Sequence, residues 1–144
     1  MFNPSRDQVR RFFFDVWAKY RAGLPLEGAE QPALEAILMH PEYHALLDQP
    51  DRHTERDYLP ESGETNPFLH LSLHLAITEQ LSVDQPPGIR DRFERLLKRV
   101  GNVMDAQHDV MDCLAEMIWQ VQHNQAAFDS AAYLYCLDRK LGDT

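Results

Sequence analysis

Two histidines, His70 and His74, stand four residues apart in the segment NPFLHLSLHLAITEQL, residues 66–81. The neutral imidazole ring is a common metal ligand, and it is also a hydrogen-bonding group that packs in protein cores. Residues four apart lie on one face of a helix, so a helix here would direct both rings toward the same neighbour. The chemistry available to the pair therefore depends on whether this segment is helical.

The alternation of leucine with other residues over 70–77 has the period of a strand. Three features outweigh it. Asn66 and Pro67 suit the N-cap and first position of a helix, the pattern continues to Leu81, and most of its residues are good helix formers. We therefore predict a helix over 67–82, with both histidines inside its broad apolar face, where their ring nitrogens need partners.

A second predicted helix, over 103–123, could supply those partners. Four of its polar residues recur at spacings of three and four and form one ridge: Asp105, His108, Asp112 and Glu116. Metal sites in helical bundles are built from carboxylates and imidazoles on facing helices, and such ligands suit zinc, iron or manganese. The sequence thus predicts a divalent-metal site with His70 and His74 as central ligands. Candidates to complete it are His108, Asp112, Glu116 and His44.

Each of these residues also has a structural interpretation. His70 and His74 could be core histidines that bond to a carboxylate or a carbonyl group. The ridge that begins at Asp105 could be a solvated helix face, because Asp109 and Gln120 widen its polar side. Both interpretations stay open from the sequence.

Several catalytic motifs are absent from the sequence. Leu71 stands where the zinc peptidase motif His-Glu-x-x-His requires its glutamate. The chain has no Glu-x-x-His, no glycine-rich nucleotide-binding fingerprint, no phosphate-binding loop and no Gly-x-Ser-x-Gly. The motifs therefore assign no reaction, leave open whether the protein is an enzyme, and predict no nucleotide cofactor.

The remaining periodic segments are also helical. They cover residues 5–20, 32–39, 89–100 and 129–141, and residues 41–47 are either a kink or a new short helix that starts at Pro41. Residues 49–65 form a polar connection, and a connection of this length is usually functional or mobile. We expect an all-α fold, a compact single-domain bundle of five to six helices over residues 1–144.

Charge and cysteine content limit the partners and the compartment. The 14 basic and 23 acidic residues give a formal charge of −9, which disfavours binding to nucleic acid or to an anionic membrane. Cys113 and Cys136 form neither a disulfide framework nor a zinc motif, and we expect two reduced thiols. Because Arg6, Asp7 and Arg10 interrupt the N-terminus before any apolar run develops, we expect no signal peptide and a cytoplasmic protein.

Three segments carry a resemblance to a known family: HPEYH at 40–44, NPFLHLSLHLAITEQLSVDQPPGI at 66–89, and HDVMDCLAEMIWQVQ at 108–122. In this order and spacing they resemble the bacterial family catalogued as domain of unknown function 1841, over nearly the whole chain. The resemblance implies a stand-alone cytoplasmic bacterial protein. It brings no activity, substrate or catalytic residue with it.

Two functions are compatible with these observations. The first is a helical-bundle protein that binds a divalent metal through histidine and carboxylate side chains on facing helices. The alternative is a non-enzymatic interaction or adaptor protein whose buried histidines are structural, and which meets a protein partner or a second copy of itself through the 49–65 loop or its acidic face.

Overall fold

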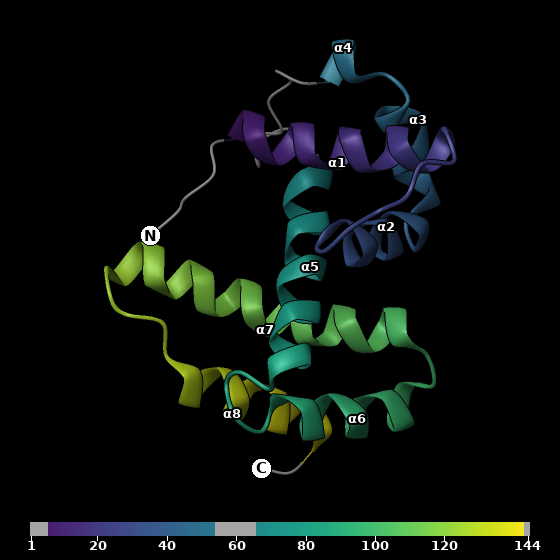
Figure 1. Cartoon of the computed structure of the whole chain (residues 1–144). Helices are drawn as coiled ribbons and strands as arrows, with labels where there is room; N and C mark the ends of the chain where they lie inside the picture. The colour runs from purple at the N-terminus through teal and green to yellow at the C-terminus, as the bar shows by residue number, and fades with distance from the viewer. Residues whose placement is uncertain (1–5, 54–65, 143–144) are drawn as a thin grey trace. The chain divides into compact units, whose positions relative to one another are not determined.

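The computed structural model describes residues 6–53 and 66–142, and within these ranges the chain is helical without any strand. The prediction of an all-α fold is confirmed for this part of the chain. Its helices are α1 (Arg6–Arg21), α2 (Glu30–Leu38), α3 (His44–Leu47), α4 (Pro50–His53), α5 (Pro67–Val83), α6 (Ile89–Val100), α7 (Val103–Asn124) and α8 (Ser130–Leu141), with a 3-10 turn, η1, over Pro41–Tyr43 (Figure 1).

The number of helices in the described residues is larger than the five or six that the sequence predicts. The difference comes from two four-residue helices, α3 and α4, which add to the longer ones. Residues 41–47 form a new short helix after Pro41 rather than a simple kink. The beginning of the predicted 49–65 loop is helical as α4, and the rest of that loop lies outside the described residues. Within the described ranges, no helix has the length and apolar content that crossing a membrane requires.

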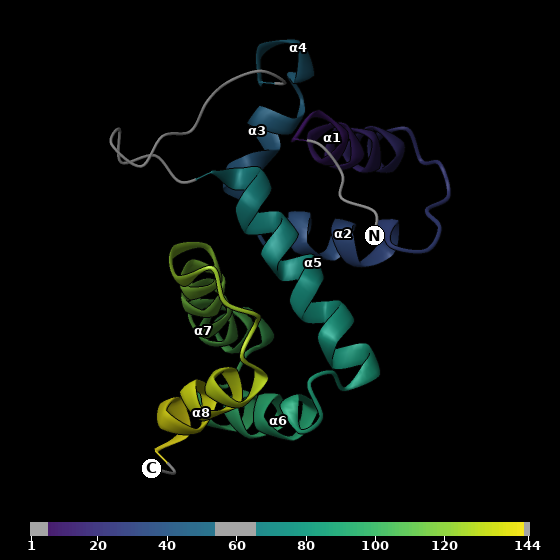
Figure 2. The same ribbon diagram turned by 90° about the vertical axis from the view of Figure 1, so that its left-hand side faces the viewer.

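The chain divides into two compact units, residues 1–75 and 76–144, with the boundary inside α5. The single domain that the sequence predicts stays a prediction. The course of the helices within each unit can be followed in Figure 2.

The first unit is built around the aromatic stripe of α1. Phe13, Val16 and Trp17 are buried on one face of this helix and pack with α2, α3 and the start of α5. Trp17 also donates a hydrogen bond from Nε1 to Asp48 Oδ1 at 2.7 Å. The core of this unit therefore fixes the segment that leads from α2 through η1 to α3.

α5 begins where the sequence places its start. The side chain of Asn66 accepts hydrogen bonds from the amides of Phe68 and Leu69 at 3.0 and 3.2 Å, which is an N-cap. Buried residues then recur every third position, at Phe68, Leu71, His74 and Ile77. The helical period is confirmed. Of the alternating leucines, Leu71 belongs to this buried row, whereas Leu73 and Leu75 are only partly buried.

In the second unit, α6, α7 and α8 pack against one another. Tyr133 of α8 is fully buried, and its hydroxyl donates a hydrogen bond to Gln80 Oε1 at 2.7 Å. The buried Gln107 of α7 donates from Nε2 to Thr78 Oγ1 at 3.4 Å. These contacts attach the last two turns of α5 to this unit. Trp119 is exposed on α7, where its ring stacks on His123 at 3.9 Å between centroids.

Cys113 of α7 and Cys136 of α8 form a disulfide, so the prediction of two reduced thiols is wrong for this structure. The two Cα atoms are 5.8 Å apart, within the range that a disulfide requires. This pairing could not be predicted from the sequence, because it depends on how two helices pack. Neither cysteine is a free nucleophile.

Candidate metal centre

Three histidines of the first unit meet at one point. The Nε2 atom of His40 lies 2.9 Å from Nε2 of His74 and 3.1 Å from Nε2 of His70. The ligand nitrogens of all three rings lie within 4.8 Å of one another. One face of α5 supplies His70 and His74, and the turn before η1 supplies His40, so two segments 30 or more residues apart in sequence form the cluster.

Local geometry explains why His40 reaches α5. His40 precedes Pro41, and a residue before proline is kept out of the helical region of backbone conformation. His40 accordingly has φ −126° and ψ 70°, between the end of α2 and the start of η1. The chain turns at this point. Both histidines are buried, His40 with 3% and His74 with 1% of its surface exposed.

Glu42 holds the other side of the His40 ring. Its Oε2 lies 2.8 Å from His40 Nδ1. If the carboxylate is ionised, His40 Nδ1 carries the proton and donates it, which leaves the Nε2 lone pair directed at the cluster. Partial burial raises the pKa of the Glu42 carboxyl, but hydrogen bonds from His40 and from its own backbone amide outweigh this and hold the pKa below its usual range.

Tyr43 closes the cluster on one side. Its ring stacks on His40 with 5.2 Å between centroids and meets the edge of His70 at 6.1 Å. Burial, together with the charge of Glu42, raises the pKa of the Tyr43 hydroxyl. The Tyr43 side chain is therefore neutral, and its ring covers one side of His40 and limits the contact of His40 with water.

The contacts among the three rings cannot all be good hydrogen bonds. With Nδ1 bonded to Glu42 as donor, His40 Nε2 has a single lone pair, yet two other Nε2 atoms approach it. A metal ion would accept a lone pair from each ring at once. Tetrahedral zinc with Zn–N bonds near 2.0–2.1 Å sets its ligand nitrogens about 3.3 Å apart, close to the separations found here.

The other predicted ligands have different surroundings. His44 directs Nε2 at the carbonyl of Ile37, at 2.9 Å, and stacks on Trp17. On α7, Asp112 is exposed and accepts from Lys140 at 3.1 Å, while exposed Glu116 accepts from Gln120 at 3.1 Å. His108, also on α7, is half-buried. These α7 residues belong to the second unit, and their role as ligands stays a prediction.

Sequence reasoning missed His40. In HPEYH it favoured His44 as a ligand, although His40 and His44 have the same spacing as His70 and His74. The available signal was Pro41, which marks His40 as the residue where the chain leaves helical geometry. That signal locates a turn, but it does not reveal what the turn faces.

Comparisons with known proteins bear on the family rather than on the chemistry. The searches of curated proteins and of solved structures found no match. The family model described as Domain of unknown function (DUF1841) matches residues 5–139, which is nearly the whole chain. The resemblance carried by the three sequence segments is thereby confirmed, and the chain belongs to this family.

Proposed function

We propose that this protein binds a divalent transition metal, and zinc in particular, through His40, His70 and His74. The observation that supports the proposal most directly is the convergence of three Nε2 atoms, at 2.9 and 3.1 Å from the central one. Neutral imidazole is a ligand for zinc and iron, whereas manganese prefers oxygen ligands. An all-histidine set therefore narrows the sequence prediction to zinc or iron.

The contact between Glu42 and His40 strengthens the proposal. Metal-ligating histidines almost always donate their other ring nitrogen to a carboxylate, a carbonyl or water, and this contact fixes the tautomer and makes the ligand more basic. His40 has this arrangement at 2.8 Å.

The group at the fourth coordination position of the metal determines the chemistry of the proposed site. Three histidines with water at the fourth position form a catalytic type of zinc site, in which the metal lowers the pKa of its bound water. Four protein ligands form a closed, structural site. The sequence leaves His108, Asp112 and Glu116 as candidates for a fourth ligand, and a closed site would favour a role in stability over one in catalysis.

The proposal is tested by measuring metal in protein purified without chelators and without a nickel affinity column. We expect close to one zinc or iron per chain by elemental analysis, and loss of the metal in His40→Gln and His74→Gln. His123→Gln is the matched control, because this exposed histidine bonds to the carbonyl of Trp119 and should leave the metal content unchanged.

A second measurement separates loss of metal from loss of fold. Zinc added to metal-free wild-type protein should raise the unfolding temperature, because a ligand that binds only the folded state stabilises it. The same zinc should have no effect on folded His40→Gln. The proposal would be contradicted if the native protein contained no metal and its unfolding temperature did not change when zinc or iron was added. That result would favour structural histidines. Applied to His108→Gln, the assay reports whether that residue is the fourth ligand.

A further inference from the structure

His44 is the second histidine of the segment HPEYH, four residues after the proposed ligand His40. Its ring is half-buried, and its Nε2 atom lies 2.9 Å from the carbonyl oxygen of Ile37. A carbonyl oxygen only accepts hydrogen bonds, so His44 Nε2 carries the proton and donates it. A protonated Nε2 has no lone pair to give to a metal. The contact therefore indicates a role for His44 other than ligation through this atom.

The carbonyl oxygen of Ile37 has a second donor. The backbone amide of His40 bonds to the same oxygen at 3.0 Å. Ile37 is fully buried and lies in the last turn of α2, where the carbonyl groups have no partner within their own helix. One oxygen thus accepts from the backbone of His40 and from the ring of His44, and this shared acceptor ties the two residues together.

The ring of His44 and the backbone of His40 each have a further contact. The His44 ring stacks on the buried Trp17 of α1 with 4.4 Å between centroids, and Trp17 in turn donates from Nε1 to Asp48. The carbonyl of His40 accepts from the amide of Tyr43 at 3.0 Å, which closes η1. The backbone of His40 is therefore held on both sides of its side chain.

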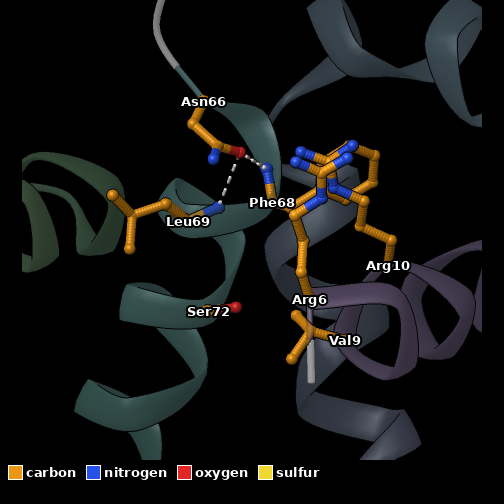
Figure 3. Close-up of a pocket in the computed structure, with 7 residues that line it drawn as sticks. All are labelled: Arg6, Val9, Arg10, Asn66, Phe68, Leu69 and Ser72. Atoms are coloured by element: carbon orange, nitrogen blue, oxygen red, sulfur yellow. Dashed lines mark hydrogen bonds between the residues drawn. The ribbon is translucent and has the colours of Figure 1, made fainter. Parts of the chain in front are cut away.

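The other two proposed ligands are held separately from His44. His70 and His74 lie on α5, and Figure 3 shows the side chain of Asn66 bonded to the first amides of this helix. The amide of His70 also donates to the carbonyl of Asn66 at 3.0 Å. A change at His44 should therefore alter the position of His40 and leave the two histidines of α5 in place.

We propose that His44 is a positioning residue of the metal site, whose bond to the carbonyl of Ile37 holds His40 in the cluster. This inference rests on the metal binding proposed above. A metal finds its complete ligand set only in molecules whose His40 is in place, so the apparent affinity falls with the fraction of such molecules. His44 thus acts on the metal through His40 and not by direct contact.

The test measures the affinity of the full chain for zinc, by competition with a chelator, and the absorption spectrum of its cobalt complex. His44→Phe keeps an aromatic ring but has no donor, and we expect its zinc affinity to be about 3- to 10-fold weaker, the effect of losing one hydrogen bond. His44→Gln places an amide N–H near the position of Nε2 and should recover most of the affinity. The cobalt bands should keep their positions in both variants, because the ligands stay the same.

Val9→Ala is the control for a general loss of stability. Val9 is partly buried against the core of the first unit, so this variant should be less stable but should bind zinc as wild type does. His44→Leu also lacks the donor and repeats the comparison with a smaller side chain, should His44→Phe fail to fold.

Three results would overturn the inference while leaving metal binding intact. The donor-free variants could bind zinc as tightly as Val9→Ala, or His44→Gln could bind it as weakly as His44→Phe. The cobalt bands could also shift in the His44 variants, which would make His44 a ligand. By contrast, a wild-type protein that binds neither zinc nor cobalt would contradict the proposed function itself.

Discussion

The contact between Glu42 Oε2 and His40 Nδ1 is the residue-scale feature with the clearest chemical consequence. Glu42 is more than half exposed, at 57%, whereas His40 is almost fully buried. The carboxylate can thus be changed with little effect on packing. Its contribution to the proposed metal site can be measured apart from its contribution to the fold.

Glu42→Ala is expected to lower the zinc affinity about 10- to 100-fold, which is the usual effect of removing the carboxylate behind a ligating histidine. The measurement is competition for zinc with a chromophoric chelator. Glu35→Ala provides the control, because Glu35 is exposed on the neighbouring α2. Equal affinities of the two variants would show that Glu42 does not support the ligand.

Prediction from sequence succeeded at single residues where one helix carries the information. The burial of His74 follows from its place among the apolar residues of α5, and the meeting of His70 with His74 follows from their spacing. The participation of His40 could not be predicted in this way, because it depends on a turn and on the packing of that turn against α5. Spacing along one helix says nothing about a partner 30 residues away.

At the scale of elements, local signals determined the helix bounds well. The predicted segments 89–100 and 103–123 correspond to α6 (Ile89–Val100) and α7 (Val103–Asn124). α6 ends at Gly101, whose φ of 90° is a left-handed conformation that favours glycine. The cysteine pairing between α7 and α8 was not predicted, because it is a property of two packed helices and not of either sequence segment.

The N-cap of α7 supplies a prediction at this scale. Asn102 Oδ1 accepts from the amide of Asp105 at 2.8 Å, so Asn102→Ala should lower the free energy of unfolding by about 1 kcal/mol. Urea denaturation followed by circular dichroism measures the change. Asn124→Ala, an exposed asparagine in the last turn of the same helix, should have a smaller effect. Equal losses would mean that the cap contributes nothing beyond helix propensity.

At the scale of the whole molecule, stability has separate sources in the two units. The first unit contains the aromatic core around α1 and the histidine cluster. The second contains three packed helices and the disulfide between Cys113 and Cys136. A change of redox conditions should therefore act on the second unit, whereas metal binding at the proposed histidine site should act on the first.

Reduction of the disulfide should lower the free energy of unfolding by roughly 3 kcal/mol, because a cross-link spanning 23 residues restricts the unfolded chain. Denaturation with and without dithiothreitol measures the difference. The double variant Cys113→Ser with Cys136→Ser serves as the control, since its stability should not respond to the reductant. A wild-type protein that is equally stable in both conditions would contradict this expectation.

The positions of the two tryptophans give the molecule a pair of optical reporters. Trp17 is buried in the first unit at 4% exposure, and Trp119 is in the second unit at 52% exposure, stacked on His123. Indole fluoresces at shorter wavelength in an apolar environment than in water, so the emission of the two residues is separable. Because the chain has two tryptophans, a variant with either one replaced by Phe would report on the unfolding of one unit through the fluorescence of the tryptophan that remains.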